Sequence, residues 1–162
     1  MINIPNFLTI LRILLVPVFI IAYHMKGPGY AAVIFVVAVL TDALDGFIAR
    51  AKGQKSTLGS ILDPMADKIL LNTSFILLAM YNKDLVWVAV IMISRDSIIL
   101  LGWLIRYIIT SNIKVDPTIL GKVTNMFQAL TVFLCLIGVA DGFKHTVIII
   151  TVVLTIISGL QY

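Results

Sequence analysis

Four aspartates lie close together in the sequence and carry its clearest chemical signal. All eight acidic residues of the chain are aspartates, and a 26-residue window holds half of them: Asp42, Asp45, Asp63 and Asp67. The first two are three residues apart and the last two are four apart, so each pair shares a face if its segment is helical. The spacing therefore predicts two pairs of carboxylates on two helices.

Four carboxylates in an apolar region need positive charge beside them. An ionised aspartate costs roughly 2.5–3.5 kcal/mol at the centre of a membrane helix, and carboxylates a few ångströms apart repel one another. Two divalent cations would balance the four charges, and carboxylate oxygens suit Mg²⁺ or Mn²⁺ better than zinc. Such a pair of ions is typical of displacement at phosphorus. Structural salt bridges are the alternative, with these basic partners: Arg50, Lys52, Lys55 and Lys68.

The composition indicates which elements position the aspartates. Apolar residues make up 60% of the 162-residue chain and charged residues only 12%, against about 25% charged in an ordinary soluble domain. The mean hydropathy is +1.09. These values exclude a soluble enzyme, a disordered chain and a nucleic-acid-binding protein, and Cys135 alone excludes an internal disulfide. We therefore expect an integral membrane protein, with the lipid bilayer around it and no nucleic acid partner.

Six apolar segments are candidates for membrane-spanning helices. They cover residues 7–25, 30–50, 60–81, 85–107, 119–138 and 145–161, with turn-forming or polar residues between several of them. The sequence predicts an all-α fold, a bundle of six transmembrane helices that forms a single domain over residues 1–162. The first segment has neither a basic leader nor a cleavage site, so we expect it to remain in the membrane.

Basic residues predict the orientation of the bundle. Six of them flank the second and fourth connections, namely Arg50, Lys52, Lys55, Arg106, Lys114 and Lys122, whereas the other side has Lys26, Lys83 and Lys144. Because basic loops stay in the cytoplasm, both termini are expected there. The second and third segments would be antiparallel neighbours, so the two aspartate pairs would face each other just below the cytoplasmic surface.

Small residues and an arginine accompany the aspartates. Gly46 follows Asp45, Ala49 shares the face of that aspartate, and Gly59 precedes Asp63 by four residues. Arg50 offers a planar donor suited to phosphate. Together these residues read D-x-x-D-G-x-x-A-R, eight further residues, then G-x-x-x-D-x-x-x-D. This pattern resembles, at every fixed position, the signature of the CDP-alcohol phosphatidyltransferases.

The resemblance extends to Pro5, Asn6, Thr9 and Arg12 near the N-terminus. It implies six transmembrane helices, a cytoplasm-facing site, a homodimer, and transfer of a phosphatidyl group from CDP-diacylglycerol to an alcohol with release of CMP. It assigns Asp42 and Asp63 to both metal ions, Asp45 to one ion, and Asp67 to the other ion and to the role of general base. The residues that it places at CDP-diacylglycerol are Asn6, Thr9, Asp45, Gly46, Ala49, Arg50, Ser56 and Gly59. Asn6 and Thr9 are equally suited to helix caps.

Three basic residues, Arg95, Arg106 and Lys122, favour an acceptor that itself carries phosphate. Arg95 and Asp96 lie near the middle of the fourth segment, too deep to be there without a partner. Arg95 either binds the acceptor phosphate from an aqueous cavity or forms an ion pair with Asp96 that fixes helix packing.

Residues 120–124 resemble the G-K-x-K-T element of the phosphatidylglycerophosphate synthases in this family, but only in part. Thr124 stands at the place of the second lysine and Asn125 at the place of the threonine. We predict glycerol 3-phosphate as the acceptor and the bacterial inner (plasma) membrane as the location. Residues 94–96 and 117–123 also resemble the cardiolipin synthases of the family, so phosphatidylglycerol remains the alternative acceptor.

Two other protein classes use acidic residues in membranes. A membrane prenyltransferase also holds a diphosphate with aspartates and Mg²⁺, but it has about nine helices and an asparagine-led motif that this chain lacks. An aspartate-lined cation transporter is the second alternative. It is less favoured because the aspartates lie at one end of the predicted bundle rather than at its middle.

Overall fold

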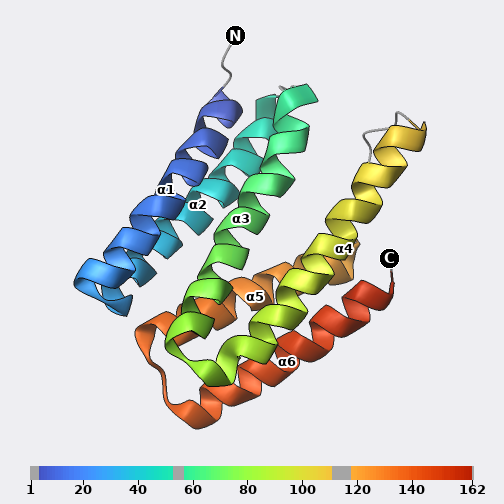
Figure 1. The fold of residues 1–162 in the computed structure, drawn as a ribbon. Coiled ribbons are helices and arrows are strands. Elements are labelled where there is room, and N and C mark those ends of the chain that lie inside the picture. The colour runs from blue at the N-terminus through green and yellow to red at the C-terminus, as the bar shows by residue number, and fades with distance from the viewer. Residues whose placement is uncertain (1–3, 53–56, 111–117, 162) are drawn as a thin grey trace. The chain divides into compact units, whose positions relative to one another are not determined.

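The computed structural model describes the backbone of residues 4–52, 57–110 and 118–161, and the side chains of residues 10–42, 68–102, 104–106, 108–109 and 118–161. Within these ranges every regular element is a helix (Figure 1). In chain order the helices are α1 (Ile4–Lys26), α2 (Pro28–Lys52), α3 (Thr57–Tyr81), the short 3₁₀ helix η1 (Lys83–Leu85), α4 (Val86–Thr110), α5 (Ile119–Ile137) and α6 (Asp141–Leu160). The all-α prediction is confirmed.

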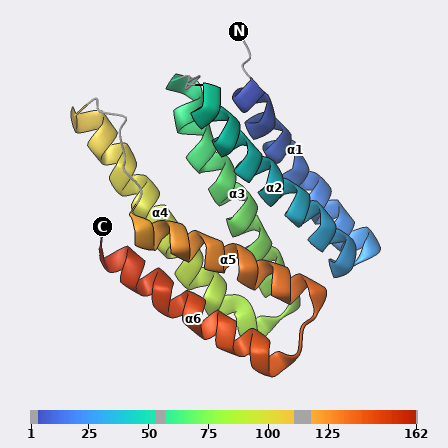
Figure 2. The ribbon, with the colours of Figure 1, turned by 180° about the vertical axis from the view of Figure 1, so that it is seen from behind.

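The chain divides into two compact units, Met1–Thr73 and Ser74–Tyr162, and the division falls within α3. In the first unit α1 and α2 form an antiparallel pair that both views show side by side (Figures 1 and 2). Gly27 joins them with a φ of 91°, a conformation that glycine adopts without strain. The two helices can therefore reverse direction over a single residue.

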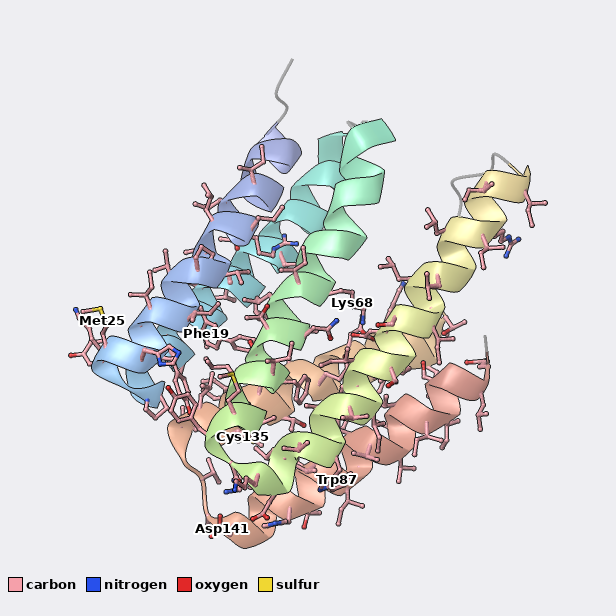
Figure 3. The ribbon with its side chains drawn as sticks, in the orientation of Figure 1. Phe19, Met25, Lys68, Trp87, Cys135 and Asp141 are labelled. Atoms are coloured by element: carbon pink, nitrogen blue, oxygen red, sulfur yellow. The ribbon has the colours of Figure 1, made fainter. Side chains whose placement is uncertain are left out.

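Small side chains bring α1 and α2 together. On α2 the buried positions include Ala31, Phe35 and Ala38, spaced as one helical face. Phe35 meets Phe19 of α1, with ring centroids 6.2 Å apart and the rings tilted by 50°. Figure 3 labels Phe19 on α1. This interface continues along α2 to Asp42 at the next position of the same face, which is where the signature begins.

The second unit packs α6 against both α4 and α5. Thr118 caps α5, since its Oγ1 accepts a hydrogen bond from the backbone N–H of Gly121 at 3.1 Å. Gly138 ends the helix in the left-handed conformation with a φ of 68°. This ending turns the chain toward Asp141, which lies at the start of α6 (Figure 3).

Hydroxyl groups line the contact between α5 and α6. The Oγ1 atoms of Thr131 and Thr151 are 2.8 Å apart, and both side chains are buried. The Thr155 hydroxyl of α6 and the Gln128 side chain of α5 both donate to the Met92 sulfur of α4, at 3.1 and 3.3 Å. Such contacts join helices in lipid, where apolar side chains gain little by leaving the bilayer.

Three helical stretches within the described part of the chain have the length and apolarity to cross a membrane. They are Lys83–Arg106, Ile119–Ile137 and Asp141–Leu160, while Pro28–Asp42 and Lys68–Tyr81 are shorter apolar stretches. Each of the six predicted segments matches one helix, and both ends of each helix lie within four residues of the predicted bounds. The presence of six membrane spans stays a prediction.

Candidate active site

The signature residues lie on α2 and α3, on either side of the short connection between them. Asp42 and Asp45 belong to α2, and Asp63 and Asp67 belong to α3, so each pair shares a helix face as predicted. The side chains of Asp45, Asp63 and Asp67 lie outside the described residues.

The length of this connection limits the distance between the two helices. From Lys52 at the end of α2 to Thr57 at the start of α3, the chain spans at most about 18 Å. Asp45 lies about 10 Å along α2 from its end, and Asp63 about 9 Å along α3 from its start. The aspartates thus lie at similar distances along their helices from two ends that are at most about 18 Å apart.

Asp42 is the one signature aspartate whose side chain is described, and it meets an arginine of α1. The Nη2 atom of Arg12 lies 2.8 Å from Asp42 Oδ1. The Arg12 side chain is 1% exposed and that of Asp42 is 45% exposed, so the pair runs from the interior of the first unit to its surface. An aspartate held in this way keeps part of its carboxylate accessible.

The resemblance includes Arg12 but assigns it no role in the site. A signal is nevertheless present, because Arg12 is the first charged residue of the chain and the only one before Lys26. An arginine in so apolar a helix requires an anionic partner. Which aspartate it meets depends on how α1 and α2 are aligned, and the sequence does not show that alignment.

The other residues that the resemblance places at CDP-diacylglycerol have side chains outside the described residues. They are Asn6, Thr9, Asp45, Gly46, Ala49, Arg50, Ser56 and Gly59. Because α1 begins at Ile4, Asn6 and Thr9 lie inside the helix and not at the position of an N-cap. The geometry thus removes the capping interpretation, while the binding interpretation stays a prediction.

The donor set fits a hard divalent cation. The four signature residues offer only carboxylate oxygens. The two histidines of the chain lie outside the signature, His24 near the end of α1 and His145 near the start of α6. Among the described side chains no group of three or more acidic, histidine or cysteine residues is gathered, since three of the four aspartates are outside that set. Carboxylate oxygens are the ligands that Mg²⁺ and Mn²⁺ take, and the binding of these ions stays a prediction.

Arg95 of α4 is buried at a junction of three helices. It is 6% exposed, and its Nη1 donates to Asp96 Oδ1 at 2.7 Å and to Asn125 Oδ1 of α5 at 3.5 Å. Its Nη2 donates to Ser158 Oγ of α6 at 2.6 Å. The ion pair with Asp96, one of the two interpretations of the sequence, is therefore present. A role of Arg95 in binding acceptor phosphate stays a prediction.

The other two predicted acceptor residues are exposed. Arg106 lies three turns beyond Arg95 on α4, and Lys122 is the fourth residue of α5. Thr124, in contrast, is fully buried, and its hydroxyl donates to the Leu120 carbonyl at 2.8 Å. A lysine at this position would place its ammonium group between α5 and α6, so the packing accounts for the threonine.

Comparison with known proteins defines the class of this site. The family model of CDP-alcohol phosphatidyltransferase matches residues 2–157. The chain therefore belongs to the CDP-alcohol phosphatidyltransferase family.

Several named proteins are similar to this chain over most of their length. The chain is 36% identical to the CDP-diacylglycerol–glycerol-3-phosphate 3-phosphatidyltransferase of Wigglesworthia glossinidia brevipalpis, over 93% of this chain and 82% of the relative. It is 34% identical to the protein of the same name from Pectobacterium atrosepticum, over 99% and 92%. A probable phosphatidylglycerophosphate synthase of Mycobacterium tuberculosis is 29% identical over 99% and 79%.

Proposed function

We propose that this protein is an enzyme of phospholipid biosynthesis that transfers the phosphatidyl group of CDP-diacylglycerol to glycerol 3-phosphate and releases CMP. The observation that carries the proposal is the complete eight-position signature, which lies on two helices joined by a short connection. The names of relatives that align over most of the chain support glycerol 3-phosphate as the acceptor.

The reaction exchanges one bond to phosphorus for another. The acceptor hydroxyl oxygen attacks the phosphorus that carries diacylglycerol, and the bond from this phosphorus to the oxygen of CMP breaks. Asp67 accepts the hydroxyl proton as the new bond forms, which a carboxylate can do when proton transfer is late. CMP leaves with the electron pair of the broken bond.

Each group of residues has a part in this reaction. Asp42, Asp45, Asp63 and Asp67 would hold two Mg²⁺ or Mn²⁺ ions, which when bound supply electrostatic stabilisation to the diphosphate. Arg50 and its neighbours in the signature bind the headgroup, and the acyl chains remain in the bilayer. Arg95, Arg106 and Lys122 attract the phosphate of the acceptor.

The membrane arrangement is part of the proposal. Three apolar stretches of sufficient length support an integral membrane protein. We propose six spans, a homodimer, and an active site at the cytoplasmic face of a bacterial inner membrane. Basic residues at the ends of α2 and α4 support this orientation.

An acceptor comparison tests the proposal. The purified protein in lipid nanodiscs is given CDP-diacylglycerol with Mg²⁺ or Mn²⁺, and CMP release is measured with glycerol 3-phosphate, phosphatidylglycerol or inositol phosphate. We expect rapid release with glycerol 3-phosphate and loss of release in Asp67→Asn. Release with phosphatidylglycerol alone would replace the proposal by cardiolipin synthesis. No release with any acceptor, together with cation flux in proteoliposomes, would identify a transporter.

A further inference from the structure

Arg12 is the most completely buried charged side chain that the structure describes. The relative exposure of the whole residue is 0%, and Arg12 lies in a helix whose other described positions up to Ala22 are apolar. The free energy of burying a guanidinium in such surroundings is strongly unfavourable unless an anion lies against it. Asp42 supplies that anion at 2.8 Å.

The register of α1 and α2 produces this contact. Arg12 lies about 12 Å along α1 from its start, and Asp42 lies about 15 Å along α2 from its end. In an antiparallel pair these positions are at similar depth. On α2, Asp42 follows Ala31, Phe35 and Ala38 on the face that is buried, so its side chain leaves the helix toward α1.

We propose that Arg12 is a positioning residue that holds the Asp42 carboxylate in the orientation in which it binds a divalent cation. This inference rests on the metal site of the proposed function. The guanidinium lies at Oδ1 of a carboxylate whose side chain is 45% exposed, so the exposed part of the group can face a cation while the buried part is fixed. Outer groups that orient a metal ligand in this way typically change metal affinity 10–100-fold when they are removed.

A purely structural role is the competing explanation, because the same ion pair also joins α1 to α2. The two roles predict different measurements. A structural contact changes the thermal stability of the metal-free protein, whereas a positioning contact changes the dissociation constant of the metal. The planar fork of arginine also holds a carboxylate more firmly than the single ammonium of lysine.

The test measures Mn²⁺ binding to the full chain in nanodiscs, by the electron paramagnetic resonance signal of free Mn²⁺. Its variants are Arg12→Gln, Arg12→Lys and Asp42→Asn. The matched control is Lys26→Gln, which removes one positive charge from an exposed residue at the end of the same helix. The thermal midpoint of each metal-free protein is recorded beside its dissociation constant.

We expect Arg12→Gln to raise the Mn²⁺ dissociation constant at least tenfold. Arg12→Lys should show a smaller rise at an unchanged thermal midpoint, and Lys26→Gln should match the wild type. In the double variant Arg12→Gln/Asp42→Asn, affinity should be no weaker than in Asp42→Asn alone, because the arginine acts through the aspartate.

Three results would overturn the inference. If Asp42→Asn weakens Mn²⁺ binding but Arg12→Gln stays within twofold of the wild type, Arg12 has no positioning role and the proposed function stands. If Arg12→Gln does not fold, wild-type affinity in Arg12→Lys refutes the inference in the same way. If the wild type binds no Mn²⁺, the metal site of the proposed function fails together with the inference.

Discussion

The junction at Arg95 offers a quantitative test that also separates its two interpretations. Asp96 is 3% exposed and its Oδ1 lies 2.7 Å from Arg95 Nη1. Replacing Arg95 with leucine takes the guanidinium away from this buried carboxylate and from Ser158. Breaking a buried ion pair by removing one partner costs about 3–5 kcal/mol. We expect Arg95→Leu to lower the free energy of unfolding toward the lower end of that range, because Asp96 has further interactions.

The double variant Arg95→Leu/Asp96→Leu removes both charges. Apolar replacement of a whole buried pair is often neutral, so this variant should regain most of the lost stability. Unfolding is followed by titration with sodium dodecyl sulfate, beside the KM for glycerol 3-phosphate. If Arg95 binds the acceptor, the double variant stays stable but keeps a raised KM. If the pair is only structural, stability and KM recover together.

Two outcomes would refute this reasoning. One is a single variant Arg95→Leu that unfolds like the wild type, since the guanidinium would then contribute nothing. The other is a double variant less stable than the sum of the two single changes, since the charges would then not be coupled.

Three further substitutions test the packing of the second unit by the same unfolding titration. In Gly159→Ala the new Cβ would lie 3.3 Å from Arg95 Cγ, so we expect a loss of about 1 kcal/mol in the free energy of unfolding. Gly142→Ala on the same helix meets nothing within 4 Å and serves as the control, and equal stability of the two variants would show that the close contact at Gly159 has no cost. Thr118→Ala removes the cap of α5 and should lower stability by about 1 kcal/mol, whereas no change would mean that the cap contributes nothing. Thr131→Val removes the hydroxyl that meets Thr151 and should lower stability by about 0.6 kcal/mol, and a more stable variant would show that this contact is unfavourable.

The helices are predictable from the sequence because continuous apolar runs leave few alternatives in lipid. The ends of the helices are harder to predict. The apolar pattern places the start of the last helix at residue 145, but the helix begins at Asp141. An aspartate in the first turn is favoured by the helix dipole, and Lys144 pairs with it at 2.6 Å. Hydropathy alone does not detect such polar first turns.

The pairs between helices could not be predicted. Arg95 meets Ser158 across 63 residues and Asn125 across 30. No sequence spacing shows that a serine or an asparagine will accept a hydrogen bond from an arginine of another helix. The partners depend on how α5 and α6 are rotated about their own axes. The ion pair of Arg95 with Asp96 was foreseeable, because both charges are adjacent in an apolar helix and neither can remain alone there.

The pairing of the signature aspartates on helix faces can be predicted from helical spacing alone. Three-residue and four-residue spacings place Asp42 with Asp45 and Asp63 with Asp67 once α2 and α3 are helices, and both helices are present. The contact of Asp42 with Arg12, in contrast, does not follow from spacing within one helix. It depends on the register of α1 against α2, which small residues and Gly27 set together.

The central claim is phosphatidyl transfer to glycerol 3-phosphate, and the most direct measurement identifies both products of one reaction. The purified protein is incubated with CDP-diacylglycerol, ¹³C-labelled glycerol 3-phosphate and Mg²⁺, and lipid and nucleotide products are quantified by mass spectrometry. The account predicts labelled phosphatidylglycerophosphate and CMP in equal amounts, with both absent in Asp67→Asn. Folded, Mg²⁺-loaded protein that leaves all label in the water-soluble fraction would contradict it.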